Sequence, residues 1–474
     1  MPQRHLDQLS STDAKFLLQE DGKPSHMHIG GLAMFEGEPP TYDAVLEHVR
    51  SRLPLVPRYR QRLESPPLSS GRPLWVDDSD FNLPFHVRRT GLPAPGGRQQ
   101  LLDLSARVMG QRLDRSRPLW EMWVVEGLED ADHEGHRGFA LLVKSHHAMV
   151  DGVGGVDILT ALFDLSPDVR EVPDDGWRPG TRVGSAELLL RAGVGAARSG
   201  AALASSVADL VRHPEQAGRR AVAGVAGLGE VLWQLVDPAP PTPINQRIGP
   251  HRRVALVRRD LAEFKEIKDA LGGTVNDVMI TAVTGALRGL LTDRAVSTDG
   301  LTMRAMVPVS IRGGSGAGGA GDGALGNQIT AMVAQLPVGI ADPVERLGTV
   351  KEGLAELKSS NKVLGAQLMT AMEEFAPPTV LARASRLSFS PRLYNLIVTN
   401  VPGPQFPIWF LGRQMREIYP LGFLSEDHAL IVAILSYDGG VYIGLLGDYD
   451  VLSDLDAFAR HLEVALDELL DAAR

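Results

Sequence analysis

Two adjacent histidines, His146 and His147, are followed closely by Asp151 and Gly152 in the segment 138–157. An imidazole titrates near neutral pH, so a histidine held at a cleft can take the proton of a hydroxyl group while the hydroxyl oxygen attacks a carbonyl. Asp151 can orient the loop or an imidazole, or it can pair with an arginine. The residue types therefore indicate general-base chemistry.

The residues around the pair predict where it lies in the fold. Residues 140–143 are a short apolar run of strand length, and Gly152, Gly154 and Gly155 allow a tight turn before a helix over 156–165. The histidines are thus expected at a strand end, where adjacent side chains point to opposite faces. They cannot easily share one metal ion, so no metal site is predicted. One histidine would face the reaction and the other would pack behind it. A pair of satisfied core histidines and a solvent-facing loop remain alternatives.

Length and composition limit the class of protein. A chain of 474 residues is expected to form two domains with a connecting segment. The net charge of -10 argues against a nucleic-acid partner, and the lack of cysteine removes disulfides and thiolate nucleophiles. The N-terminus lacks the pattern of a signal peptide, and the uncharged apolar stretches are too short to span a bilayer. We expect a cytoplasmic protein whose membrane contact, if any, is peripheral.

Several motifs share a resemblance to one family. Residues 146–152, HHAMVDG, resemble the HHxxxDG motif of acyltransferases with a chloramphenicol-acetyltransferase-like fold. Five further segments resemble motifs of the wax ester synthase/diacylglycerol O-acyltransferase family in particular: LSSTDAKF (9–16), PLW (118–120), Asn276-Asp277, PVSIR (308–312) and NVPGP (400–404). The resemblance covers essentially the whole chain.

The resemblance implies an α/β fold of two chloramphenicol-acetyltransferase-like domains with mixed sheets, joined by a helical linker. We expect an N-terminal domain over 1–183 that carries the motif, a helical and Pro-rich linker over 184–250, and a C-terminal domain over 251–474. The implied function is acyl transfer from acyl-CoA to diacylglycerol and/or a long-chain alcohol, giving triacylglycerol or wax ester. Acyl-CoA is then a co-substrate, a lipid hydroxyl is the acceptor, and no cofactor is expected.

The resemblance also suggests a role for each motif residue. His147 would be the general base in a direct transfer, His146 would pack or hydrogen-bond behind it, and Gly152 would let the loop turn. An arginine of the second half commonly pairs with the motif aspartate in this fold, which makes Arg312 the candidate partner of Asp151.

A helix is predicted to begin after Thr274, with Asn276 and Asp277 in its first turn. Asp277 suits the positive end of the helix dipole there. If this helix end faces the cleft, Asn276 can support a developing oxyanion.

Two rival functions remain at this stage. One is a condensation-type acyltransferase that accepts its acyl group from a carrier protein, and the other is a non-catalytic protein of a lipid surface. The segment 184–236, rich in Ala, Gly, Leu and Val, predicts two helices that either dock between the domains or lie on a lipid surface. In the second case the protein would be found at the inner membrane or on lipid inclusions.

Overall fold

The structure is a computed structural model, and it describes most of both halves of the chain. The described residues are 7–20, 22–67, 71–129, 136–149, 161–180, 183–190, 193, 237–310, 329–359 and 389–474. Asp151, Gly152 and Arg312 lie outside these residues, and so does most of the predicted helical segment 184–236.

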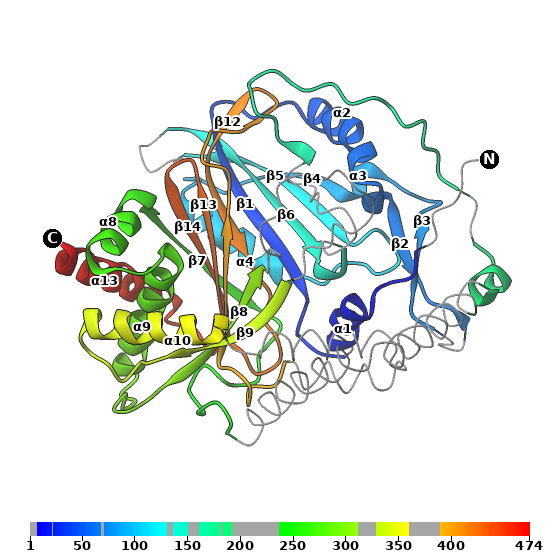
Figure 1. Cartoon of the computed structure of the whole chain (residues 1–474). Helices are drawn as coiled ribbons and strands as arrows, with labels where there is room; N and C mark the ends of the chain where they lie inside the picture. The colour runs from blue at the N-terminus through cyan, green and yellow to red at the C-terminus, as the bar shows by residue number, and fades with distance from the viewer. Residues whose placement is uncertain are drawn as a thin grey trace, which may run out of the picture.

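The first half alternates short helices with strands (Figure 1). Its helices are α1 (Ser11–Gln19), α2 (Tyr42–Arg52), α3 (Leu83–His86) and α4 (Arg98–Gly110), with 3-10 turns η1 (Leu53–Leu55), η2 (Pro57–Arg60) and η4 (His147–Met149). Its strands are β1 (His28–Glu36), β2 (Gln61–Glu64), β3 (Leu74–Asp77), β4 (Val87–Gly91), β5 (Trp120–Leu128) and β6 (Gly138–His146). The apolar run 140–143 is thus the middle of a longer strand, and His146 is the last residue of that strand.

The second half follows the same α/β alternation. Its helices are α8 (Leu261–Leu271), α9 (Val275–Asp293), α10 (Pro343–Ser359) and α13 (Leu455–Ala473). Its strands are β7 (Arg252–Asp260), β8 (Met303–Ser310), β9 (Ile329–Leu336), β10 (Leu396–Pro402), β11 (Trp409–Phe410), β12 (Arg413–Leu421), β13 (Leu430–Tyr437) and β14 (Gly440–Asp448).

Two six-stranded mixed sheets form the core of the molecule. The first has the order β11-β12-β1-β6-β5-β4, and the second has the order β7-β14-β13-β10-β8-β9. In the first sheet β6 lies antiparallel between β1 and β5, and β5 pairs in parallel with β4. Every residue of β6 is buried, which is expected of a central strand that is covered on both faces.

Strands from the second half complete the first sheet. β12 pairs antiparallel with β1, from Gly30 opposite Leu421 to Phe35 opposite Met415. The expected C-terminal range 251–474 is therefore not confined to one sheet, because residues 409–421 cross over to the other. Gly444 of β14 lies so close to the backbone of Pro420 that a Cβ atom there would be 1.8 Å from the Pro420 carbonyl oxygen. The two sheets thus meet along β12 and β14.

The helices α8, α9, α10 and α13 cover the second sheet on the side away from the first (Figure 1). α9 begins with a capping box, in which Thr274 Oγ1 accepts from the Asp277 amide and Asp277 Oδ2 accepts from the Thr274 amide. Thr274 is therefore the N-cap that the sequence predicts. Gly285 and Gly289 of α9 allow close contact with Ala465 and His461 of α13.

Within the described part of the chain, no single helix is both long and apolar enough to cross a bilayer. α8 and α9 together have the length and composition of a spanning segment, but the pair is bent by 98°. Most of α9 is buried in the protein core.

Candidate active site

The two histidines lie where β6 ends and the turn η4 begins, and their side chains have different surroundings. His146 is 1% exposed, and its Nδ1 accepts a hydrogen bond of 3.0 Å from the Ala148 amide. Its Nε2 lies 3.2 Å from Oε1 of Glu20, a contact within ion-pair distance that does not meet hydrogen-bond geometry. Because Nδ1 accepts a hydrogen bond, it carries no proton, and the proton of the neutral ring is on Nε2. His146 therefore has one hydrogen bond at Nδ1 and a close carboxylate at Nε2.

His147 is only partly buried and lies in an aromatic environment. The Phe16 ring stacks on its imidazole with centroids 4.0 Å apart, and the Phe423 ring meets it edge-on at 5.7 Å. Phe389 closes the group, at 6.0 Å from both Phe16 and Phe423. Phe16 comes from α1, whereas Phe389 and Phe423 come from the second half of the chain. The imidazole therefore borders an apolar wall to which both halves contribute.

A buried glutamate, Glu20, lies beside His146. Glu20 follows α1 and is 1% exposed, and its Oε2 accepts a hydrogen bond of 2.8 Å from Arg115. Burial alone would raise the pKa of Glu20, but the close contact with His146 and the hydrogen bond from Arg115 outweigh it. The net effect holds the pKa of Glu20 well below its usual range, so the carboxylate is ionised at neutral pH.

His28 lies directly opposite His146 across the β1–β6 pair, on the same face of the sheet. Its Nε2 is 3.7 Å from Glu20 Oε1. Burial and the positive charge of Lys144 lower the pKa of His28 well below its ordinary value, so this ring is neutral. Lys144 itself is held by Glu121 and by the Val108 and Gln111 carbonyls.

Asn276 and Asp277 lie at the start of α9 in the second half. Asp277 is buried, and its carboxylate closes the capping box. Asn276 Oδ1 accepts a hydrogen bond of 3.1 Å from Asn400 Nδ2 of β10, so the Asn-Asp and NVPGP motifs are in contact. Within the described residues, neither side chain has a hydrogen bond that reaches the histidine pair. The oxyanion role of Asn276 stays a prediction.

The expected roles of Asp151, Gly152 and the Asp151–Arg312 pair fall outside the described residues and also stay predictions. Trp120 of the PLW motif packs in the core of the first half. It is 1% exposed, its ring stacks on His86, and its Nε1 donates to the Tyr59 carbonyl.

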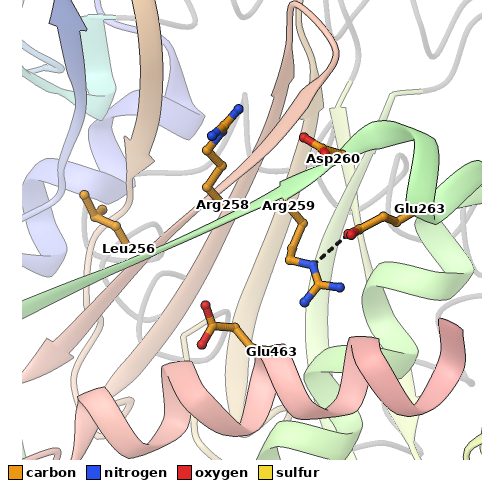
Figure 2. Close-up of a pocket in the computed structure, with 6 residues that line it drawn as sticks. All are labelled: Leu256, Arg258, Arg259, Asp260, Glu263 and Glu463. Carbon is orange, nitrogen blue, oxygen red and sulfur yellow. Dashed lines mark hydrogen bonds and ion pairs between the residues drawn. The ribbon is translucent and has the colours of Figure 1, made fainter. Parts of the chain in front are cut away.

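A charged hollow of about 360 Å³ lies on the second half, between β7, α8 and α13 (Figure 2). It is lined by Leu256, Arg258, Arg259, Asp260, Glu263 and Glu463. Arg259 is bound to Glu263 and Asp467. A hollow with five charged lining residues is unsuited to an acyl chain, and none of its lining residues belongs to the histidine site.

Sequence reasoning missed Glu20, Phe389 and Phe423, and it did not assign Phe16 to the site. Phe16 and Glu20 lie four residues apart at the end of one helix, a spacing that places two side chains on the same face. That spacing is a usable signal for those two residues. Phe389 and Phe423 approach the histidines only through the tertiary fold, and no local pattern marks them.

Solved structures with the same architecture define the class of fold. The first condensation domain of the calcium-dependent antibiotic synthetase matches with a TM-score of 0.60 at 14% identity, covering 99% of this chain and 97% of that one. The trichothecene 15-O-acetyltransferase TRI3 of Fusarium sporotrichioides matches with a TM-score of 0.59 at 11% identity, covering 98% and 95%. At these identities the likeness shows the fold alone. It is the predicted fold of two chloramphenicol-acetyltransferase-like domains.

Closer relatives identify the family. The wax ester synthase/diacylglycerol acyltransferase catalytic domain matches residues 9–279, and the C-terminal domain of the same family matches residues 325–470. Two Mycobacterium tuberculosis proteins named diacylglycerol O-acyltransferase are 34% and 33% identical, covering 99% and 98% of this chain and 91% and 96% of their own lengths. The wax ester synthase/diacylglycerol acyltransferase of Marinobacter aquaeolei VT8 matches with a TM-score of 0.68 at 26% identity, covering 98% and 99%. The chain belongs to this family of acyltransferases.

Proposed function

We propose that this protein transfers an acyl group from acyl-CoA to the hydroxyl of diacylglycerol, and also to that of a long-chain alcohol, with His147 as the general base. The observation that carries the proposal is the difference between the two motif histidines. His146 is buried between the Ala148 amide and the Glu20 carboxylate, whereas His147 lies partly exposed beside the phenylalanine wall.

The proposed reaction is a direct transfer. The acceptor oxygen attacks the thioester carbonyl while His147 takes the hydroxyl proton, and the carbon–sulfur bond then breaks. The departing CoA thiolate takes the proton back from His147, so the ring is neutral again after each turnover. The chain has no cysteine, which excludes an acyl-cysteine intermediate.

The apolar surroundings of His147 support a lipid substrate. Phe16, Phe389 and Phe423 offer an apolar surface to an acyl or alkyl chain, and burying each methylene of such a chain is worth about 0.8 kcal/mol. The names of the mycobacterial relatives favour diacylglycerol as the acceptor, and the name of the Marinobacter relative adds the long-chain alcohol.

A carrier-protein donor is the second candidate for the acyl source. Condensation domains share the fold, but at 14% identity they carry no argument about the donor. Contact with a membrane or lipid inclusion also remains a prediction, because most of the segment 184–236 lies outside the described residues.

The test measures thiol release from palmitoyl-CoA by the full-length protein, with dipalmitoylglycerol, with hexadecanol and without an acceptor. Palmitoyl-pantetheine, which has the thioester arm of a carrier protein without the nucleotide, serves as the second donor. We expect acceptor-dependent release from palmitoyl-CoA, with triacylglycerol or wax ester as the product. Turnover of palmitoyl-pantetheine alone would contradict a CoA donor, and no turnover by folded protein would contradict the proposed activity.

A further inference from the structure

Glu20 is connected to the backbone on both sides of His147, although it belongs to a segment more than a hundred residues earlier in the chain. The first connection runs through Met27. Glu20 Oε1 accepts a hydrogen bond of 2.6 Å from the Met27 amide, and the Met27 carbonyl accepts one of 2.8 Å from the His147 amide. The position of the His147 amide thus depends on a residue that Glu20 binds.

The second connection runs through His146. Its Nε2 lies 3.2 Å from the same carboxylate oxygen, and its Nδ1 accepts from the Ala148 amide at 3.0 Å. A carboxylate beside Nε2 favours the proton on that nitrogen, which leaves Nδ1 free to accept. Loss of the carboxylate removes this preference. In the other tautomer, Nδ1–H would face the Ala148 N–H, and that hydrogen bond would be lost.

The helix α1, which ends directly before Glu20, also contacts the turn that begins with His147. α1 packs against η4, and its Phe16 stacks on the His147 ring. Arg115 holds Glu20 from the other side through Oε2, and Arg112 donates to the Glu20 carbonyl. Arg115 and Arg112 therefore hold Glu20 in place independently of its contacts with the histidine turn.

We propose that Glu20 is a positioning residue of the active site, which sets the His146 tautomer and holds the two backbone amides flanking the His147 side chain. The inference rests on the proposed role of His147 as the base. Glu20 does not touch the reacting atoms in this account. It acts through Met27 and His146, and it aligns His147 with the acceptor hydroxyl.

The variant Glu20→Gln keeps the shape of the side chain but turns one oxygen into a donor. If the NH₂ group takes the place of Oε2, it faces the Arg115 donor. If it takes the place of Oε1, it faces the Met27 amide and His146 Nε2. In either case donors face donors and one set of polar contacts is lost. A small misplacement of a catalytic group can cost about 10²-fold in rate, so we expect kcat to fall about 10- to 100-fold. The KM for palmitoyl-CoA should stay within about twofold, because no substrate contact is removed.

The matched control is Glu417→Gln. Glu417 of β12 is also 1% exposed. It accepts hydrogen bonds from Arg98 of α4 and from Tyr419 of β12, much as Glu20 accepts one from Arg115. This control removes a comparable buried carboxylate at a place that the histidine turn does not use. We expect it to lower stability while kcat per folded molecule stays unchanged.

Two readouts that do not depend on turnover complete the test. Nitrogen NMR of the histidine rings should show Nε2-protonated His146 in the wild type and a changed tautomer in Glu20→Gln. Hydrogen exchange of the His147 and Ala148 amides should become about tenfold faster in Glu20→Gln only. If Glu20→Gln does not fold, Arg115→Ala should show a smaller change in the same directions, because Arg115 is one of the groups that fix the carboxylate.

Unchanged kcat, tautomer and exchange in Glu20→Gln would overturn the inference, and so would an equal loss of kcat in Glu417→Gln. If the wild type itself shows no turnover, the proposed function fails. In that case the His146 tautomer and the exchange rates of the His147 and Ala148 amides still test whether Glu20 positions the histidine turn.

Discussion

Arg52 and Asp164 form a buried ion pair in the first half of the chain, and Asp164→Asn tests its contribution to stability. The side chains of Arg52 and Asp164 are 1% and 3% exposed, and Nη2 of Arg52 donates to both carboxylate oxygens, at 2.7 and 2.9 Å. Within the described residues, Nε and Nη1 of Arg52 have no hydrogen-bond partner. The backbone of Asp164 pairs with Trp409 of β11 through two hydrogen bonds of 2.9 Å. The ion pair therefore holds the crossover strands to the first half.

Asp164→Asn leaves the Arg52 charge buried with only a neutral partner. Removing one member of a buried pair typically costs about 3–5 kcal/mol, a large part of the roughly 5–15 kcal/mol by which proteins are stable. We expect a fall of that size in the free energy of unfolding, measured by urea denaturation followed by tryptophan fluorescence. The double variant Arg52→Met/Asp164→Leu should recover most of the loss, because it leaves no unpaired charge.

The control comes from the same helix. Glu47 and Arg50 of α2 form an exposed pair, with 72% and 58% of their side-chain surfaces accessible. Glu47→Gln should change stability by less than about 1 kcal/mol. An Asp164→Asn protein as stable as the Glu47→Gln control would refute the reasoning, and so would a double variant that is less stable than the single one.

The remaining predictions concern acid sensitivity and the contact between the sheets. Burial lowers the pKa of His86 and of His428 from 6.5 to about 4, so the unfolded chain binds more protons than the folded protein between these values. Their contribution to stability is complete above pH 6.5 and falls toward pH 4, by up to about 1.4 kcal/mol per pH unit for each histidine. Urea midpoints measured from pH 7 to 5 should therefore decline, and His86→Gln should flatten the slope. Gly444→Ala should destabilise by about 1–3 kcal/mol in the same assay, because its Cβ would lie 1.8 Å from the Pro420 oxygen.

The Gly444 prediction has a control in the chain. Gly353 lies inside α10 with open space around it, so Gly353→Ala should stabilise by about 0.5–1 kcal/mol. A flat pH profile, or a Gly444→Ala protein as stable as Gly353→Ala, would contradict the account.

The sequence predicts the local part of this fold well. The apolar run 140–143 and the Thr274 N-cap depend on neighbours in the sequence, and each marks an element that the structure contains. The pairing of β12 with β1 could not be predicted in this way. It joins residues almost 400 positions apart, and its register is set by the packing of both sheets.

The site shows the same division. Strand geometry alone predicts that His146 and His147 point to opposite faces, and His146 is indeed buried while His147 lies beside Phe16. The sequence does not say which histidine faces inward, because the carboxylate that lies beside His146, that of Glu20, is brought there by the tertiary fold. Contacts of this kind exist only after α1 has packed against the end of β6.

The role of His147 as the base is tested most directly by the acceptor-dependent kcat of His147→Gln, measured as thiol release from palmitoyl-CoA with saturating dipalmitoylglycerol. A general base contributes typically about 10²- to 10⁴-fold, so we expect kcat to fall by that factor in a protein that remains folded. A kcat within about threefold of the wild type would show that His147 is not the base.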